Sequence, residues 1–310
     1  MPKPSKTLFI IGGATASGKT AAALRLAEYF KTEILSADSR QFYREMRIGT
    51  AKPSPEELAA VRHHFIDSLS ITDHYSVGDF ERDALAILET LYERVDSAVL
   101  VGGSGLFLEA VSAGLDQFPA VSQEVKMQVA AGEKAGGLEW LQLQLSALDP
   151  AYFQRVDQQN PARLRRALEV CLASGQPYSA YLSRPKPRRP FTPVFMLLEW
   201  PRQELYTRID ARVDSMLEAG LEQEARQLYP YKHVPALRTV GYEEWWPYFE
   251  GDASREEVVE KIKQHSRNYA KRQATWFRKH GAWQAFHPAE QESMLRYCQQ
   301  ELGRISGGGQ

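Results

Sequence analysis

Residues 13–20 (GATASGKT) have the types and the spacing of a phosphate-binding loop, because they fit the pattern Gly, four residues, Gly-Lys, then Ser or Thr. Glycines in such a loop let backbone N–H groups turn toward phosphate oxygens, and the start of the following helix adds partial positive charge. Lys19 is then placed for terminal phosphate oxygens and the Thr20 hydroxyl for Mg²⁺. The pattern indicates phosphate binding and does not by itself require a nucleoside triphosphate.

A carboxylate could share that site. Three apolar runs predict buried strands, and they end at the loop, at Asp38 and at Gly102. Ligands of an open parallel sheet lie beyond the carboxyl ends of its strands, so we expect Asp38 and Ser104 to face bound phosphate across one crevice. Asp38 is the candidate general base, although an Asp here could equally cap a turn or a helix. Motor and switch NTPases usually carry a metal-supporting Asp where Gly102 stands, which disfavours ATP hydrolysis as the main activity.

Two arginines on a predicted helix are further candidates. Arg208 and Arg212 lie four residues apart and therefore share one helix face. They could serve a phosphate site or form a solvated face of ion pairs with Glu204, Asp210 or Asp214, and spacing alone does not separate the two interpretations.

The segment Lys261–His280 is strongly basic, with seven Lys and Arg residues and no acidic one. Exposed charges of one sign repel, so a partner of opposite charge is implied, and a nucleic-acid phosphate backbone is the natural one. Tyr269, Trp276 and Phe277 are interleaved with the cations, and we expect them on the buried face of a helix rather than stacked on bases.

The elements that position these residues alternate between strand and helix, which predicts an α/β fold with a P-loop NTPase-like parallel sheet flanked by helices. After Phe118-Pro119 the pattern becomes helical, which predicts a core domain of residues 1–118 and 194–310 interrupted by a helical insertion domain of 119–193. His63-His64 is expected at the surface or in a turn, and the tail 305–310 is expected to lack structure. The expected strands are 8–11, 33–37, 98–101 and 194–200, and the expected helices are 20–30, 77–95, 203–229 and 255–279.

Composition narrows the class of protein. The chain has 310 residues, a net charge of −1 and an apolar fraction of 43%, so a sizeable core is possible and nucleic acid would need a local basic patch. Two unclustered cysteines, Cys171 and Cys298, predict neither a disulfide framework nor a zinc site. No signal peptide or membrane span is expected, which favours a cytoplasmic setting.

Together these pieces resemble the tRNA dimethylallyltransferases, also called tRNA isopentenyltransferases, over roughly residues 7–280. One phosphate loop would be weak support, but seven collinear segments are specific. The segments are GGATASGKT (12–20), SADSRQFYREMRIGTAKP (36–53), VGGSGLFLEAVSAGL (101–115), RLRRALEV (163–170), RIDARVDSMLEAGLEQEA (208–225), RTVGYEE (238–244) and YAKRQATWFR (269–278).

The resemblance implies transfer of a dimethylallyl group from dimethylallyl diphosphate to the exocyclic N6 amine of the adenosine 3′ to the anticodon, with Mg²⁺ and release of diphosphate. It implies that Asp38 accepts the amine proton, that Ser104 assists, that Arg212 stabilises the leaving group and that Thr20 serves the metal. It further assigns diphosphate binding to Gly13, Thr15, Ala16, Ser17, Gly18, Lys19 and Thr20, and contact with the anticodon arm of tRNA to Asp38, Ser39, Arg40, Gln41, Ser104, Lys126, Ala162, Arg163, Leu164, Arg165, Arg166, Lys271 and Arg272.

The chain departs from the family pattern at Ser104, Lys126 and Ala162, where Thr, Arg and Gln are usual; the last two departures affect tRNA contact and not the chemistry. Three other functions fit parts of the pattern. They are a P-loop small-molecule kinase, an adenylate isopentenyltransferase that prenylates free AMP, ADP or ATP, and a non-catalytic tRNA-binding protein. The helical insertion and the basic segment favour a macromolecular acceptor, and the chain is expected to act as a monomer.

Overall fold

The structure is a computed structural model that describes residues 6–182 and 186–307. The chain divides into two compact units, a larger one of Met1–Ala113 with Arg189–Gln310 and a smaller one of Gly114–Arg188. The smaller unit lies at the place of the expected insertion, with boundaries shifted toward the N-terminus. The sheet resumes with Phe191, which is why the smaller unit ends earlier than residue 193.

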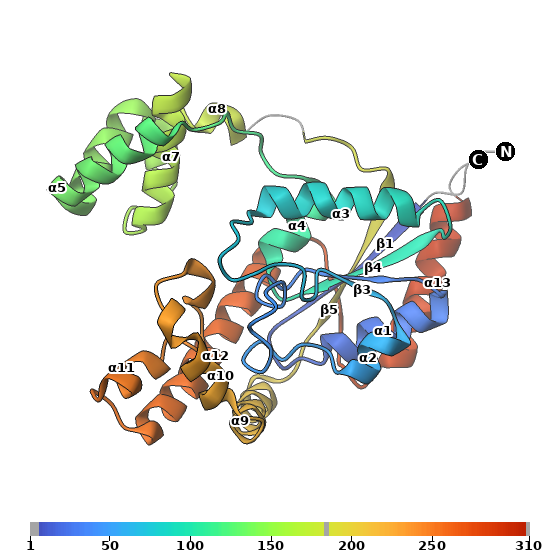
Figure 1. The fold of residues 1–310 in the computed structure, drawn as a ribbon. Helices are drawn as coiled ribbons and strands as arrows, with labels where there is room; N and C mark the ends of the chain where they lie inside the picture. The colour runs from blue at the N-terminus through green and yellow to red at the C-terminus, as the bar shows by residue number, and fades with distance from the viewer. Residues whose placement is uncertain (1–5, 183–185, 308–310) are drawn as a thin grey trace. The chain divides into compact units, whose positions relative to one another are not determined.

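Six parallel strands form the sheet of the larger unit, in the order β3-β2-β4-β1-β5-β6. The phosphate loop follows β1, which lies beside β4 at the centre of this order (Figure 1). Asp38 follows β2, which pairs with the other edge of β4. This architecture confirms the expected α/β class. The strands are β1 Lys6–Gly13, β2 Ile34–Ser36, β3 His63–His64, β4 Ser97–Gly102, β5 Phe191–Leu198 and β6 Gln284–Phe286.

Helices cover both faces of the sheet, and alternate residues of β1 point into the two resulting cores. Leu8 and Ile10 pack with α3, α4 and Phe277 of α12, whereas Phe9 and Ile11 pack with α1 and α13. Every one of these β1 side chains is fully buried, which places the following loop at the end of a rigid element. The helices are α1 Lys19–Phe30, α2 Pro55–Ala60, α3 Val77–Leu91, α4 Gly105–Ala113, α9 Arg202–Glu218, α12 Arg255–Lys279 and α13 Gln291–Gly307.

A third core of the larger unit lies among α9, α10 (Leu221–Leu228), α11 (Trp245–Glu250) and α12. Tyr242 and Trp245 are its largest fully buried side chains. Short 3₁₀ turns at Tyr229–Tyr231 and Pro235–Leu237 lie between α10 and α11.

The smaller unit is helical over the residues described, with α5 (Gln123–Leu148), α6 (Pro150–Phe153), α7 (Pro161–Ser174) and α8 (Ser179–Leu182). Leu141 and Leu145 of α5 pack on Leu164 and Leu168 of α7 to form its core. Gly137 adopts φ 62° within α5 and kinks the helix there.

Three expectations about the larger unit were wrong. The helix expected over 203–229 is two helices, because Gly220 adopts a left-handed φ of 100° between α9 and α10. His63-His64 forms the edge strand β3, where His64 Nε2 lies 2.6 Å from a carboxylate oxygen of Glu33. The tail 305–310, expected to lack structure, is helical up to Gly307, where α13 ends. Residues 308–310 lie outside the described part. None of the described helices is long and apolar enough to cross a membrane.

Candidate active site

The phosphate loop joins β1 to α1 and borders a cavity of about 440 Å³. Ala16 and Gly18 adopt positive φ angles of 61° and 88°, which give the loop its turn. Gly13 lies at the end of β1, where a Cβ atom would come within 2.6 Å of the Ser17 hydroxyl. The cavity is lined by Thr15, Ala16, Ser17, Gly18, Lys19, Thr20, Asp38, Gln41, Ala51, Gly103, Arg208, Ala211, Arg212, Ser215, Tyr269 and Gln273.

Two cations and one carboxylate meet at this cavity. Burial lowers the pKa of Lys19 to about 8, while the Asp38 charge raises it and the Arg212 charge lowers it. Burial likewise lowers the pKa of Arg212, and Asp38 opposes that shift. Lys19 Nζ donates to the Ala14 carbonyl at 2.6 Å. The site thus holds more positive than negative charge in a poorly solvated place, which favours an anionic ligand.

Asp38 also lines a second cavity, of about 360 Å³. Its Oδ1 accepts from Arg40 N at 3.0 Å, so Asp38 caps a turn while it also lines both cavities. Capping therefore does not exclude a role as base. The two cavities share Thr15, Asp38, Arg212 and Tyr269. The second is otherwise lined by Ser39, Arg40, Gly49, Thr50, Ile209, Val213, Met216, Arg238, Thr239, Val240, Gly241, Glu243, Ile262, Ser266 and Arg272.

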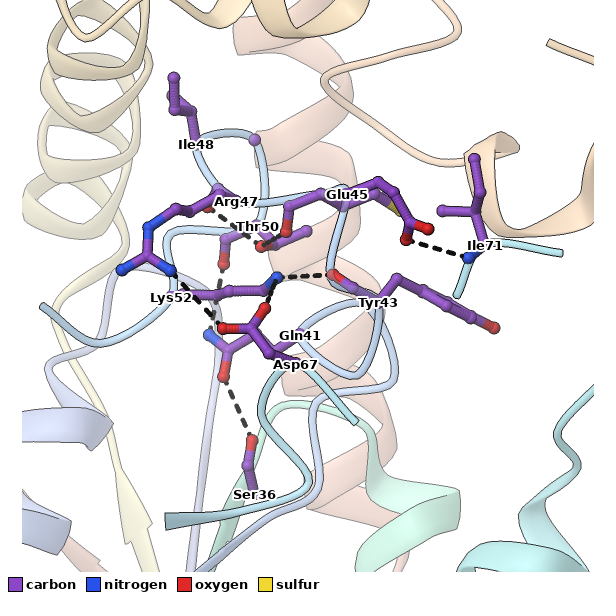
Figure 2. Close-up of polar contacts among 12 residues, drawn as sticks. Ser36, Gln41, Tyr43, Glu45, Arg47, Ile48, Thr50, Lys52, Asp67 and Ile71 are labelled. Atoms are coloured by element: carbon purple, nitrogen blue, oxygen red, sulfur yellow. Dashed lines mark hydrogen bonds and ion pairs between the residues drawn. The ribbon is translucent and has the colours of Figure 1, made fainter. Parts of the chain in front are cut away.

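The loop that follows Asp38 is braced by the buried side chain of Gln41 (Figure 2). Gln41 Nε2 donates to the carbonyls of Thr50 at 3.3 Å and Ala51 at 3.2 Å, and the Ser36 hydroxyl donates to Gln41 Oε1 at 3.2 Å. Gln41 therefore ties the two ends of the loop together from inside. This leaves its amide engaged within the protein, although the resemblance assigned it to tRNA.

A partly buried ion pair also holds this loop. The Lys52 ammonium, with a side chain only 1% exposed, donates to the Tyr43 carbonyl and to Asp67, both at 2.5 Å (Figure 2). Arg47 lies 3.5 Å from the second oxygen of Asp67. Glu45 accepts from the backbone N–H of Ile71 at 3.1 Å and joins the loop to the segment after β3. The path from Asp38 to Thr50 is fixed by these contacts.

Glu224 of α10 supplies a third brace. Its carboxylate accepts from the consecutive backbone N–H groups of Arg47, Ile48 and Gly49 at 2.8–3.0 Å and from the Tyr242 hydroxyl at 2.7 Å. Gly49 has room for no side chain, because a Cβ atom would lie 2.6 Å from the Tyr242 ring. An acceptor cluster of this kind satisfies backbone donors that would otherwise be left without a partner.

The Arg40 side chain forms hydrogen bonds within the protein. Its guanidinium donates to the carbonyls of Ala236 at 3.0 Å and Arg238 at 3.4 Å. It thereby holds the start of the segment Arg238–Gly241, which lines the second cavity and which the sequence did not single out as part of a site. Ser39 borders the same cavity.

The acidic residues near Arg212 do not pair with it. Asp210 binds Arg267 and Asp214 binds Lys263, both at 2.6 Å, so these acids of α9 hold α12 instead. The ion-pair interpretation of the arginine face is therefore wrong for Asp210 and Asp214. Arg208 donates to the Ala16 carbonyl at 3.1 Å and thus contacts the phosphate loop directly.

One face of α12 completes the site. Phe277 is buried as expected, but Tyr269 is 39% exposed and lines both cavities, so the expectation of a buried face was wrong for it. Desolvation and then the Asp38 charge raise the pKa of the Tyr269 hydroxyl to about 12. Arg272 borders the second cavity, and Lys271 borders a separate cavity of about 270 Å³.

Sequence reasoning missed Gln273 and placed Ser104 differently. The buried Gln273 accepts from Thr15 N at 2.8 Å and donates to the Gly103 carbonyl at 2.9 Å. Its only signal in the sequence is its spacing of four residues from Tyr269. Gly103 and not Ser104 lines the first cavity, and the Ser104 carbonyl begins α4 by accepting from Phe107 N at 3.0 Å.

The residues of the smaller unit that were expected to contact tRNA differ in exposure and in their partners. Lys126, Ala162 and Arg163 are exposed, and the exposed Arg166 lies 5.4 Å over the Phe118 ring. Arg165 is held by Glu133 through two hydrogen bonds of 2.6 Å. Leu164 is fully buried in the core of the unit, so its side chain supports the fold and does not face a partner.

The protein groups near the first cavity fit a Mg²⁺ ion that is coordinated jointly by protein and phosphate oxygens, rather than by protein side chains alone. Among the residues described, no three His, Cys, Asp or Glu side chains gather to hold a metal. Thr20 and Asp38 offer oxygen atoms at the cavity. This sparse oxygen set suits Mg²⁺, which usually keeps waters and phosphate oxygens beside one or two protein ligands.

Comparison with known proteins gives one consistent family. The profile of the IPP transferase family matches residues 41–280. A tRNA dimethylallyltransferase of Christiangramia forsetii is 48% identical over 275 residues, covering 89% of this chain and 91% of that protein. A crystal structure of a tRNA isopentenylpyrophosphate transferase from Bacillus halodurans has a TM-score of 0.73 at 32% identity and covers 97% of this chain and 98% of that one. A eukaryotic dimethylallyltransferase acting on tRNA has a TM-score of 0.78 at 26% identity, over 88% and 70% of the two chains.

Proposed function

Because the chain belongs to the IPP transferase family, a family of transferase enzymes, we propose that it moves a dimethylallyl group from dimethylallyl diphosphate to the exocyclic N6 amine of the adenosine 3′ to the anticodon of tRNA. The observation that carries this proposal is the pair of cavities that meet at Asp38 and Arg212. One cavity is bordered by the phosphate loop, and the other can admit an acceptor to the same carboxylate.

The donor occupies the first cavity with its diphosphate on the phosphate loop. Attack is on the allylic carbon, so the carbon–oxygen bond breaks, phosphorus is untouched and diphosphate leaves. Negative charge grows on the leaving group, and the ammonium of Lys19, the guanidinium of Arg212 and the loop N–H groups are placed to meet it. The phosphate loop thus stabilises a leaving group instead of activating a phosphoryl group.

The acceptor amine enters by the second cavity and reaches Asp38. Adenine N6 is a weak nucleophile that becomes acidic only as its new bond forms, so Asp38 need accept the proton only in the transition state. The target base must leave its stack in the RNA to arrive there. Tyr269, which borders both cavities, is placed beside the incoming base.

Mg²⁺ would be held by the Thr20 hydroxyl together with diphosphate oxygens. When bound, it would neutralise part of the charge that develops on the leaving group. The protein's own part is to fix the loop and keep Lys19 and Arg212 beside those oxygens.

Exposed cations supply contact with the tRNA backbone. Lys271 and Arg272 adjoin the cavities on α12, while Lys126, Arg163 and Arg166 lie exposed on the smaller unit. Phosphate contacts of this type position a nucleic acid without reading its sequence. The protein is proposed to act as a monomer in the cytoplasm.

The decisive experiment is mass spectrometry of nucleosides from unmodified tRNA after incubation with the protein, Mg²⁺ and dimethylallyl diphosphate. A gain of one dimethylallyl group on adenosine is expected. Free AMP, ADP and ATP are tested as acceptors in parallel, and modification of these in place of tRNA would indicate an adenylate isopentenyltransferase. Phosphate transfer from labelled ATP to a small molecule, with no prenylation, would indicate a kinase.

A further inference from the structure

The face of α12 that meets the sheet lies very close to the backbone beyond β4. A Cβ atom at Gly103 would lie 2.3 Å from Nε2 of Gln273, and one at Gly105 would lie 2.0 Å from the Trp276 ring. Glycine at both positions therefore lets the helix approach the strand end. The closest polar group brought in by this approach is the amide of Gln273.

That amide joins two segments that form the donor cavity. Oε1 of Gln273 accepts from the backbone N–H of Thr15, and Nε2 donates to the carbonyl of Gly103. Gln273 is only 7% exposed and both halves of its amide are engaged, so the amide has one orientation. Asparagine is one methylene shorter, and a charged residue would leave one of the two partners unmatched.

Resting on the proposed function, we propose that Gln273 is a positioning residue for the diphosphate donor, which locks the Thr15 end of the phosphate loop to the Gly103 end of β4. Its bond to Thr15 N keeps that N–H away from the donor, so the loop N–H groups that meet diphosphate are those after Thr15. Thr15 also borders the acceptor cavity. Fixing it sets the loop, and Lys19 with it, relative to Asp38 before either substrate arrives.

The first test replaces the amide with an apolar side chain of similar length. Gln273→Met leaves Thr15 N and the Gly103 carbonyl without partners, and the phosphate loop is expected to shift. The dissociation constant for inorganic pyrophosphate, measured by calorimetry, and the KM for dimethylallyl diphosphate should both rise about tenfold. The dissociation constant for tRNA should stay near the wild-type value. Gln264→Ala, at an exposed glutamine of α12 outside the cavities, is the matched control and should change none of these.

The second test separates positioning from a general role in stability. In Gln273→Glu the protonated carboxyl group can still accept from Thr15 N and donate to the Gly103 carbonyl, whereas the ionised form can only accept and repels diphosphate. The pyrophosphate-binding deficit of Gln273→Glu, taken relative to wild type, should therefore shrink as pH falls. The deficit of Gln273→Met should stay constant.

Two results would overturn the inference. One is a folded Gln273→Met protein that binds pyrophosphate as tightly as wild type. The other is a pair of Gln273→Glu and Gln273→Met deficits that run parallel across pH, which would indicate only general damage. Pyrophosphate binding does not depend on the acceptor or on prenyl transfer. A wild-type protein inactive with the donor would therefore refute the proposed function while leaving this test intact.

Discussion

Affinity for diphosphate should fall as pH rises through about 8, because Lys19 loses its charge there. Burial lowers the pKa of Lys19 from 10.5 to about 8. With that pKa, about nine-tenths of the Lys19 side chains carry a proton at pH 7 and about one-tenth at pH 9. If the charged form alone holds the ligand, affinity for pyrophosphate decreases about tenfold over this interval.

Calorimetry of inorganic pyrophosphate binding between about pH 6.5 and about 9.5 measures this decrease, with pyrophosphate ionisation as the main complication. Lys19→Arg is the matched control, because its guanidinium stays charged across the range. The ratio of wild-type to Lys19→Arg affinity cancels ionisation of the ligand and isolates residue 19. If the pyrophosphate affinities of wild type and Lys19→Arg change in parallel through pH 8, the assignment of this titration to Lys19 is refuted.

The neighbours of Lys19 set the direction of two further shifts. Asp38 raises the Lys19 pKa and Arg212 lowers it, so Asp38→Asn should move the binding midpoint down in pH and Arg212→Ala should move it up. As pH rises through this range, pyrophosphate affinity should fall, whereas the contribution of Lys19 to the stability of the unliganded protein should increase. Between pH 8 and 10.5 the unfolded chain holds a proton that folded Lys19 has released, so this group makes the free energy of unfolding rise with pH.

Three other substitutions test the site. Asp38→Asn should lower kcat by about 10²–10⁴-fold in a prenylation assay while the tRNA dissociation constant stays within about twofold, and a large loss of tRNA binding would contradict the role as base. Arg212→Ala should raise the KM for dimethylallyl diphosphate by about tenfold or more, and unchanged kinetics would remove Arg212 from the site. Glu224→Gln should lower the free energy of unfolding by ~1–3 kcal/mol in urea titration, since weaker acceptance leaves the loop N–H groups at Arg47–Gly49 poorly paired; an unaltered midpoint would show that Glu224 is no brace.

The parts of the fold that sequence could predict are those governed by local patterning. The phosphate loop, the central strands and α12 follow from glycine spacing and apolar periodicity, and the structure has them at nearly the expected residues. The short edge strand at His63-His64 could not be predicted, because two residues carry no periodicity and the pairing with β2 is a tertiary contact. The break between α9 and α10 depends on one left-handed glycine, Gly220.

The candidate site shows the same division. Lys19 and Asp38 follow strand ends, so parallel-sheet topology brings them to one edge of the sheet. Gln273 and Glu224 act through contacts spanning 258 and 175–177 residues of sequence, and neither residue type announces such a role. Arg40 and Leu164 show the converse limit, since a segment assigned as a whole to RNA contact includes side chains that are engaged or buried inside the protein.

The contacts that hold the loop after Asp38 also affect how tightly an acceptor can bind. Ordering a flexible backbone costs about 1–2 kcal/mol per residue in conformational entropy. Gln41, Lys52 and Glu224 impose that order during folding, with no substrate present. The part of the second cavity that this loop lines therefore has its final shape before an adenosine binds, so binding carries no entropic cost for ordering the loop.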